Sequence, residues 1–167
     1  NPNKAGWHAT RDVVGELASA VRAEGLKFGV YYSGGVDWTF KHKRIESFAD
    51  FMVSMPGEAE GYTAYANAHY DELIERYQPD YLWNDIAYPS AQASFDILAK
   101  YYNTVPEGLT NDRWITPDGI LPEGAFDKPE GLTGLLPPMP QVWDARTPEY
   151  GMFDRILPFQ WETTRGM

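Results

Sequence analysis

The sequence contains no cysteine among its 167 residues. A chain without cysteine has no disulfide framework, no thiolate nucleophile and no thiolate ligand for a metal ion. Histidine is scarce as well, and His8, His42 and His69 do not form the i, i+4 pair of a helical metal site. We therefore expect neither a bound metal nor a cofactor.

Basic residues are outnumbered, with 14 Lys and Arg against 24 Asp and Glu and a net charge of -10. A surface of that sign repels the phosphates of nucleic acids and of anionic membranes. No segment has the pattern of a membrane span or of a signal peptide. We expect a soluble protein that binds no nucleic acid, with a periplasmic or secreted location left open. The oligomeric state cannot be derived from these features.

Aromatic residues, by contrast, make up 15% of the chain, with six Trp, 11 Tyr and eight Phe. The hydrophobic content of 43% is that of a folded globular protein. Most of the rings are expected in the core. Their number is high enough that some should line a cleft, where an aromatic face can stack on a ligand.

Helical and strand-like segments alternate along the chain. Apolar residues recur at helical spacing in three segments, residues 11–24, 61–77 and 90–103. Short strand-like runs that end in polar residues cover residues 26–32, 79–85, 108–113 and 159–162. This alternation favours a parallel α/β fold, and the absence of a glycine-rich phosphate motif argues against a dinucleotide fold.

A (β/α)₈ barrel usually needs about 250 residues. We therefore predict that residues 1–167 are the central part of a single (β/α)₈ catalytic domain, an incomplete TIM-like barrel with roughly four strand-helix units, truncated at both ends. Such a piece leaves two strand edges and an apolar face open. Alone it is expected to aggregate, dimerise or stay loose, and to be inactive.

Two long segments interrupt the alternation. Residues 41–60 are charged and irregular, and we expect a loop with at most one helical turn. Residues 115–142 hold six prolines and four glycines without periodicity. A loop of this length and composition usually carries function or lies over a site.

The run Pro79–Asp85 delivers a carboxylate to the C-terminal end of a buried strand, where barrel enzymes place their catalytic groups. Trp83 lies two residues before Asp85 and would supply an apolar wall and a stacking face, which indicates a sugar site. The alternative is that Asp85 only caps the following turn, since Asp is common at such positions.

Other catalytic groups have weaker support. Gly34 and Gly35 lack the spacing of a phosphate-binding loop, and Ser33, Ser90 and Ser94 lack a nucleophile-elbow motif. The carboxylates remain as the candidates.

Retaining glycoside hydrolysis needs two carboxyl groups roughly 5 to 5.5 Å apart. Asp85 and Glu149, which follows the long loop, could meet in one cleft. Arg113, at the end of the next strand, could hold Asp85 or bind sugar hydroxyls. The alternative is that Arg113 only forms a salt bridge, to Asp112 or to another neighbouring acid.

Five segments in this order resemble the retaining α-L-fucosidases: Lys27–Trp38, Leu82–Asp85, Asn111–Trp114, Thr147–Tyr150 and Trp161–Gly166. Each motif alone is weak, whereas the ordered set is specific. The resemblance covers nearly the whole chain except the 115–142 loop.

The resemblance implies an exo-acting glycosidase that removes α-L-fucose from oligosaccharides or glycoconjugates without a cofactor. It implies that Asp85 is the nucleophile and Glu149 the acid/base. Tyr31, or its neighbour Tyr32, would bind the sugar together with Trp83.

The resemblance further implies that Arg113 contacts the substrate near the acid/base and that Trp161 lines the floor of the cleft. Additional fucose-binding groups of the family are expected upstream of this chain. Two alternatives stay open: a non-catalytic sugar-binding fragment, and a barrel glycosidase with a different sugar specificity.

Overall fold

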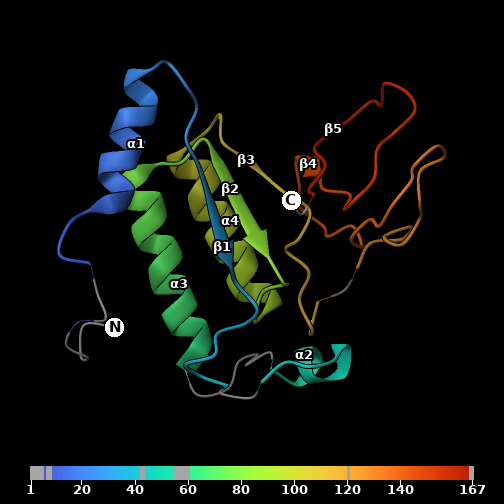
Figure 1. The fold of residues 1–167 in the computed structure, drawn as a ribbon, viewed down its shortest axis with the longest axis horizontal. Helices are drawn as coiled ribbons and strands as arrows, with labels where there is room; N and C mark the ends of the chain where they lie inside the picture. The colour runs from blue at the N-terminus through green and yellow to red at the C-terminus, as the bar shows by residue number, and fades with distance from the viewer. Residues whose placement is uncertain (1–5, 7–8, 42–43, 55–60, 120, 166–167) are drawn as a thin grey trace.

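A computed structural model describes residues 6, 9–41, 44–54, 61–119 and 121–165. Its central sheet has three parallel strands in the order β1 (Gly29–Ser33), β2 (Tyr81–Asp85) and β3 (Leu109–Thr110). Helices α1 (Val13–Ala23), α3 (Tyr62–Glu72) and α4 (Ala91–Thr104) lie beside and behind these strands (Figure 1). The predicted α/β class is confirmed.

The ends of the predicted helices shift for local reasons. Helix α1 begins at Val13 because the carboxylate of Asp12 accepts a hydrogen bond from the N–H of Gly15 at 3.0 Å, as an N-cap does. The helix predicted over 61–77 is α-helical to Glu72 and ends in a π-helical turn, Leu73–Tyr77.

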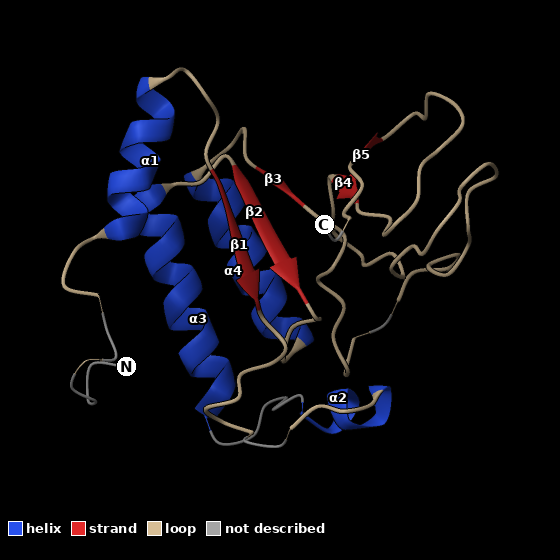
Figure 2. Ribbon diagram, in the orientation of Figure 1, coloured by secondary structure: helices blue, strands red, loops and turns tan. Residues whose placement is uncertain are grey.

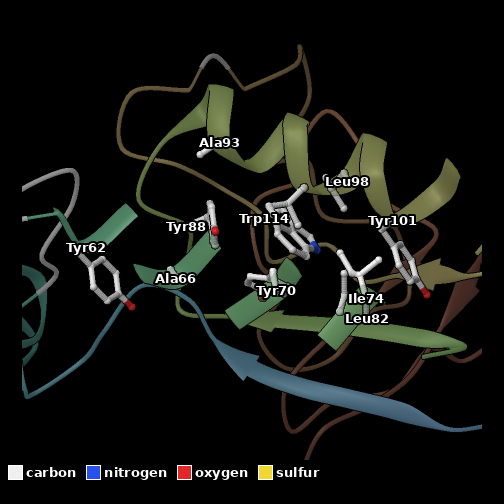
Figure 3. Packing of buried hydrophobic residues seen from close by; sticks show 11 residues of the cluster. Tyr62, Ala66, Tyr70, Ile74, Leu82, Tyr88, Ala93, Leu98, Tyr101 and Trp114 are labelled. Atoms are coloured by element: carbon white, nitrogen blue, oxygen red, sulfur yellow. The ribbon is translucent and has the colours of Figure 1, made fainter. Parts of the chain in front are cut away.

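The interior of the protein lies between the helices and the sheet. Figure 3 shows Trp114 among the side chains that fill this space, and its ring centroid is 5.2 Å from that of Tyr70. The buried cluster consists of Tyr62, Ala66, Tyr70, Ile74, Leu82, Tyr88, Ala93, Ile97, Leu98, Tyr101 and Trp114. Four of the chain's 11 tyrosines lie in this cluster, whereas rings such as Trp38 and Tyr150 are exposed.

Strand β2 presents different residues to its two faces, because side chains alternate along a strand. Leu82 and Asn84 are fully buried on the helix-covered side. Tyr81, Trp83 and Asp85 therefore point to the opposite face, which carries no helix (Figure 2). This helix-free face positions the site.

Strands β4 (Ala145–Arg146) and β5 (Gln160–Trp161) pair in parallel and form a second, two-stranded sheet. Asn111, just after β3, forms a parallel bridge with Ala145. The prediction of four strands was wrong, since β4 makes a fifth. Two residues are too short to produce a periodic pattern, so their strand character depends on their partners.

The prediction for residues 41–60 also needs correction. Helix α2 (Phe48–Ser54) lies in this segment, and residues 42–43 and 55–60 are outside the described part. Ser47 accepts from the N–H of Asp50 at 3.1 Å and donates to its carboxylate at 2.8 Å. This exchange stabilises the helix start, and Ser-x-x-Asp was the signal that could have predicted it.

Asp80 connects the starts of β1 and β2. Its carboxylate accepts from the Phe28 N–H at 2.9 Å and from Lys27 Nζ at 2.8 Å. The Lys27 ammonium, followed by the Phe28 N–H, lowers the pKa of Asp80 below its ordinary value. The charged form is therefore more stable in the folded chain than in the unfolded one.

In the complete protein that carries this segment, we expect Asp80→Asn to lower the free energy of unfolding by about 1 kcal/mol at pH 7, because it replaces charge-assisted hydrogen bonds by neutral ones. A carboxyl whose pKa is lowered on folding stabilises above its unfolded pKa of about 3.9, and this stabilisation is lost as pH falls through the lower folded value. Urea titrations should show the difference between the variant and the wild type shrinking as pH falls below about 3.9. Glu107→Gln, at an exposed position, serves as control. A difference that stays constant with pH would contradict the assignment.

Candidate active site

The helix-free face of the sheet forms one wall of a cleft of about 480 Å³, within the range typical of small-ligand sites. Five of the six residues predicted for the site line it together. The full lining is Gly29, Val30, Tyr31, Tyr81, Trp83, Asp85, Arg113, Glu149, Glu162 and Thr164. Side chains from distant parts of the sequence thus meet in one place.

The carboxylate of Asp85 is held by three donors. Its Oδ1 accepts from the backbone N–H of Ile86 at 2.9 Å and from Arg113 Nη1 at 3.1 Å. Its Oδ2 accepts from the hydroxyl of Tyr31 at 2.7 Å. Both oxygens are therefore fixed in orientation at the edge of the cleft.

The turn after Asp85 has an unusual backbone that Asn84 stabilises. Ile86 and Ala87 have φ angles of 61° and 65°, which are costly for residues with side chains. The Nδ2 of Asn84 donates to the carbonyls of Ala87 and Arg113, at 2.9 Å in both cases. One buried amide thus joins the ends of two strands and sets the direction in which Asp85 leaves the sheet.

Arg113 connects the two candidate catalytic carboxylates. Its Nη1 donates to Asp85 Oδ1 at 3.1 Å and to Glu149 Oε1 at 2.5 Å. Since both contacts share one nitrogen, the two oxygens are no farther apart than the sum of these distances. Retaining glycosidases separate their carboxyl groups by roughly 5 to 5.5 Å and inverting ones by roughly 6.5 to 9.5 Å. This upper limit for one pair of oxygens is compatible with the retaining separation and shorter than the inverting one.

Asp112, which the sequence offered as an ion-pair partner for Arg113, pairs with Arg146 instead. Asp112 forms an ion pair with Arg146 at 2.7 Å and is fully buried, whereas Arg113 faces the cleft. Neighbouring residues in an extended segment point to opposite sides, which separates the two.

The backbone of Glu149 is held on two sides. Its N–H donates to the Leu135 carbonyl at 2.7 Å, and the N–H of Leu135 donates back at 3.0 Å. A parallel bridge to Thr164 holds the other side. Only glycine permits this close approach of the loop at position 134, since a Cβ at Gly134 would lie 2.4 Å from the Glu149 carbonyl oxygen. The 115–142 loop thus helps to position Glu149.

Aromatic and cationic groups form the wall next to Asp85. The rings of Tyr31 and Trp83 stack with centroids 5.4 Å apart, and the Arg113 guanidinium carbon lies 4.9 Å from the Trp83 ring centroid. The indole N–H of Trp83 donates to Glu162, which also accepts from the Tyr81 hydroxyl at 3.1 Å. The wall is aromatic with polar groups at its edges, as is typical of small-molecule sites.

Between the two tyrosines named for sugar binding, only Tyr31 lines the cleft. Tyr32 lies on the helix side, where its hydroxyl hydrogen-bonds His69 Nδ1 at 2.8 Å. Burial, together with the hydrogen bond and charge of Asp85, raises the pKa of Tyr31 to about 12. Its hydroxyl therefore keeps its proton and can donate across the neutral pH range.

Trp161 is not among the residues that line the cleft. Its ring packs edge-on against Phe153, with centroids 4.8 Å apart. The next residue, Glu162, faces the cleft instead. Tyr81, Glu162 and Thr164 were not predicted as lining residues, although Tyr81 lies two residues before Trp83 and hence on the same face of the strand.

His69 interacts with Tyr32, Tyr65 and the core, and burial lowers its pKa. His8 and His42 lie outside the described residues. Within the described part of the chain, no three His, Asp or Glu side chains form a group that could hold a metal ion. In the same part, no helix is long and apolar enough to cross a membrane.

Two carboxyl groups that face one aromatic-walled cleft define the kind of site found in glycoside hydrolases. A family model described as alpha-L-fucosidase matches residues 3–166. The chain belongs to the α-L-fucosidase family.

Individual relatives agree with this assignment. The tissue alpha-L-fucosidase of Bos taurus is 31% identical over 124 residues, which cover 68% of this chain and 24% of the relative. The alpha-L-fucosidase of Branchiostoma floridae is 32% identical over 131 residues, covering 68% and 27%. The chain thus spans about a quarter of the length of these curated relatives.

Solved structures show the same relationship. A structure described as alpha-L-fucosidase matches with a TM-score of 0.71 and 38% identity, over 93% of this chain and 30% of that chain. The Thermotoga maritima alpha-fucosidase in complex with a mechanism-based inhibitor matches with a TM-score of 0.68 at 38% identity, with the same coverage.

Proposed function

We propose that this chain is the central part of the catalytic domain of an exo-acting, retaining α-L-fucosidase that removes terminal α-L-fucose from oligosaccharides or glycoconjugates. The observation that carries the proposal is the single Arg113 nitrogen that contacts both Asp85 and Glu149. The choice of fucose as the sugar is based on the family assignment, and the structure of the Thermotoga maritima relative has been solved in complex with fucose.

The arrangement of the strands supports an incomplete (β/α)₈ barrel. Strands β1, β2 and β3 are parallel and adjacent in chain order, and the Asn111–Ala145 bridge leads on to the parallel pair β4 and β5. In the described part of the chain, helices pack on one face of the sheet, as on the outside of a barrel. The cleft then corresponds to the inner face of the barrel, with Asp85 at the carboxyl end of β2.

The chemistry follows in two steps. Asp85 attacks the anomeric carbon of fucose while Glu149 donates a proton to the departing glycosidic oxygen, which leaves fucose bonded to Asp85. Glu149 then accepts a proton from a water molecule that attacks the same carbon, and the bond to Asp85 breaks. Two inversions give net retention of configuration.

The remaining residues bind and orient the sugar. Trp83 and Tyr31 offer a stacked aromatic wall, and the Tyr31 hydroxyl and the Arg113 guanidinium provide donors beside Asp85. For Trp161, support comes from the family resemblance alone.

The test is the stereochemistry of hydrolysis by the complete enzyme that carries this segment. With an aryl α-L-fucoside, proton NMR should detect the α anomer of fucose first, before mutarotation produces the β anomer. A panel of other aryl glycosides should be cleaved far more slowly. First appearance of the β anomer would exclude a retaining mechanism. Faster cleavage of a different glycoside would show that the enzyme is specific for another sugar. Binding of fucose without release of the aryl group would show that the protein binds sugar without catalysis.

A further inference from the structure

A buried ion pair lies directly behind the active-site arginine. Asp112 and Arg146 are 0% and 4% exposed, and Arg146 Nε lies 2.7 Å from Asp112 Oδ2. Burial raises the pKa of Asp112 and lowers that of Arg146. A buried pair of this kind is weak evidence for stability, which indicates another use.

The other oxygen of Asp112 is directed at Thr147. Asp112 Oδ1 accepts a hydrogen bond from the Thr147 hydroxyl at 2.6 Å. A hydroxyl has one proton, and a carboxylate can only accept. The lone pairs of the Thr147 oxygen are therefore left for a donor on the opposite side.

That donor is Arg113. Its Nε donates to the Thr147 hydroxyl at 2.9 Å, and its Nη2 donates to the Thr147 backbone carbonyl at 3.1 Å. Two contacts with one residue fix the plane of the guanidinium group. The remaining nitrogen, Nη1, then points at Asp85 and Glu149.

The geometry points to Thr147, oriented by Asp112, as a positioning residue that fixes Arg113 and thereby the separation of the two catalytic carboxylates. This inference rests on the proposed function for the roles of Asp85 and Glu149. Without the hydroxyl, the carbonyl is the one contact that Thr147 still makes with the guanidinium group. One contact no longer fixes the plane of the group, so Nη1 can shift relative to Asp85 and Glu149. A displacement of about 1 Å at catalytic groups can cost on the order of 100-fold in rate.

The matched variants are Thr147→Val, which removes the hydroxyl at nearly constant shape, and Thr147→Ser, which keeps it. In the complete enzyme, Thr147→Val should lower kcat for an aryl fucoside by about 10- to 100-fold and change KM by less than about threefold. Thr147→Ser should stay within about threefold of the wild type in kcat. Equal losses in both variants would overturn the inference, because they would show a packing role.

A double-mutant cycle identifies the residue through which Thr147 acts. If it acts through Arg113, Thr147→Val should cause less than about a twofold further loss in an Arg113→Ala background. Independent losses that multiply would overturn the inference. Asp112→Asn in the Arg113→Ala background should behave in the same way.

A crystal structure of Thr147→Val decides the question without using activity. The guanidinium group should lose its contact with Asp85 or with Glu149, and unchanged contacts would overturn the inference. If the wild type fails to hydrolyse fucosides, the proposed function fails, and the position of Arg113 in the variant still decides the role of Thr147.

Discussion

In the complete enzyme that carries this segment, Asp85→Ala should lower hydrolysis of aryl fucosides by on the order of 10⁴-fold or more, as expected when a catalytic nucleophile is lost. Without the carboxylate, no covalent fucosyl intermediate forms. The fold should remain intact, because the Asp85 side chain is 20% exposed and its donors can turn to water in the open cleft.

Azide provides the matched test. In Asp85→Ala the vacated space should admit azide, which attacks the anomeric carbon directly and gives β-fucosyl azide by one inversion. Asp85→Asn keeps the shape and fills that space, so it should be equally inactive and not rescued. If Asp85→Ala kept more than about a tenth of the wild-type activity, Asp85 would not be the nucleophile and would only cap the turn.

Glu149→Ala should show an effect that depends on the leaving group. For a substrate whose leaving group needs protonation, kcat/KM should fall by about 10²- to 10⁴-fold, the usual contribution of general acid catalysis. For an activated aryl fucoside the first step should survive better than the second. A pre-steady-state burst of the aryl group, followed by slow turnover, would show this in stopped-flow measurements.

The anomeric product separates the two carboxylates. Azide needs no general base, so with Glu149→Ala it should accelerate the second step and give α-fucosyl azide, the opposite anomer from Asp85→Ala. Glu162→Ala is the matched control, since Glu162 lines the same cleft and accepts from Trp83 and Tyr81. If Glu149→Ala were silent and Glu162→Ala showed the leaving-group dependence, Glu162 would be the proton donor.

Adjacent residues show where sequence patterns stop being informative. Tyr31 and Tyr32 are both aromatic residues on one strand, and alternation predicts only that they face opposite sides. The helices on the Tyr32 side leave Tyr31 to line the cleft. Asp112 and Arg113 are a similar pair, with one buried beside Arg146 and the other facing Asp85.

Local sequence patterns were sufficient to predict part of this structure. Helical periodicity predicted α1, α3 and α4, and a strand ending in a carboxylate placed Asp85, because each depends on residues close together in the chain. The tertiary structure decided the features that need distant partners. Strand β4, the support of Glu149 by Leu135 and Thr164, and the route from Asp112 through Thr147 to Arg113 all arise from such contacts. A local sequence pattern does not predict these contacts, because hydrogen bonds between distant segments form only when the fold brings those segments together.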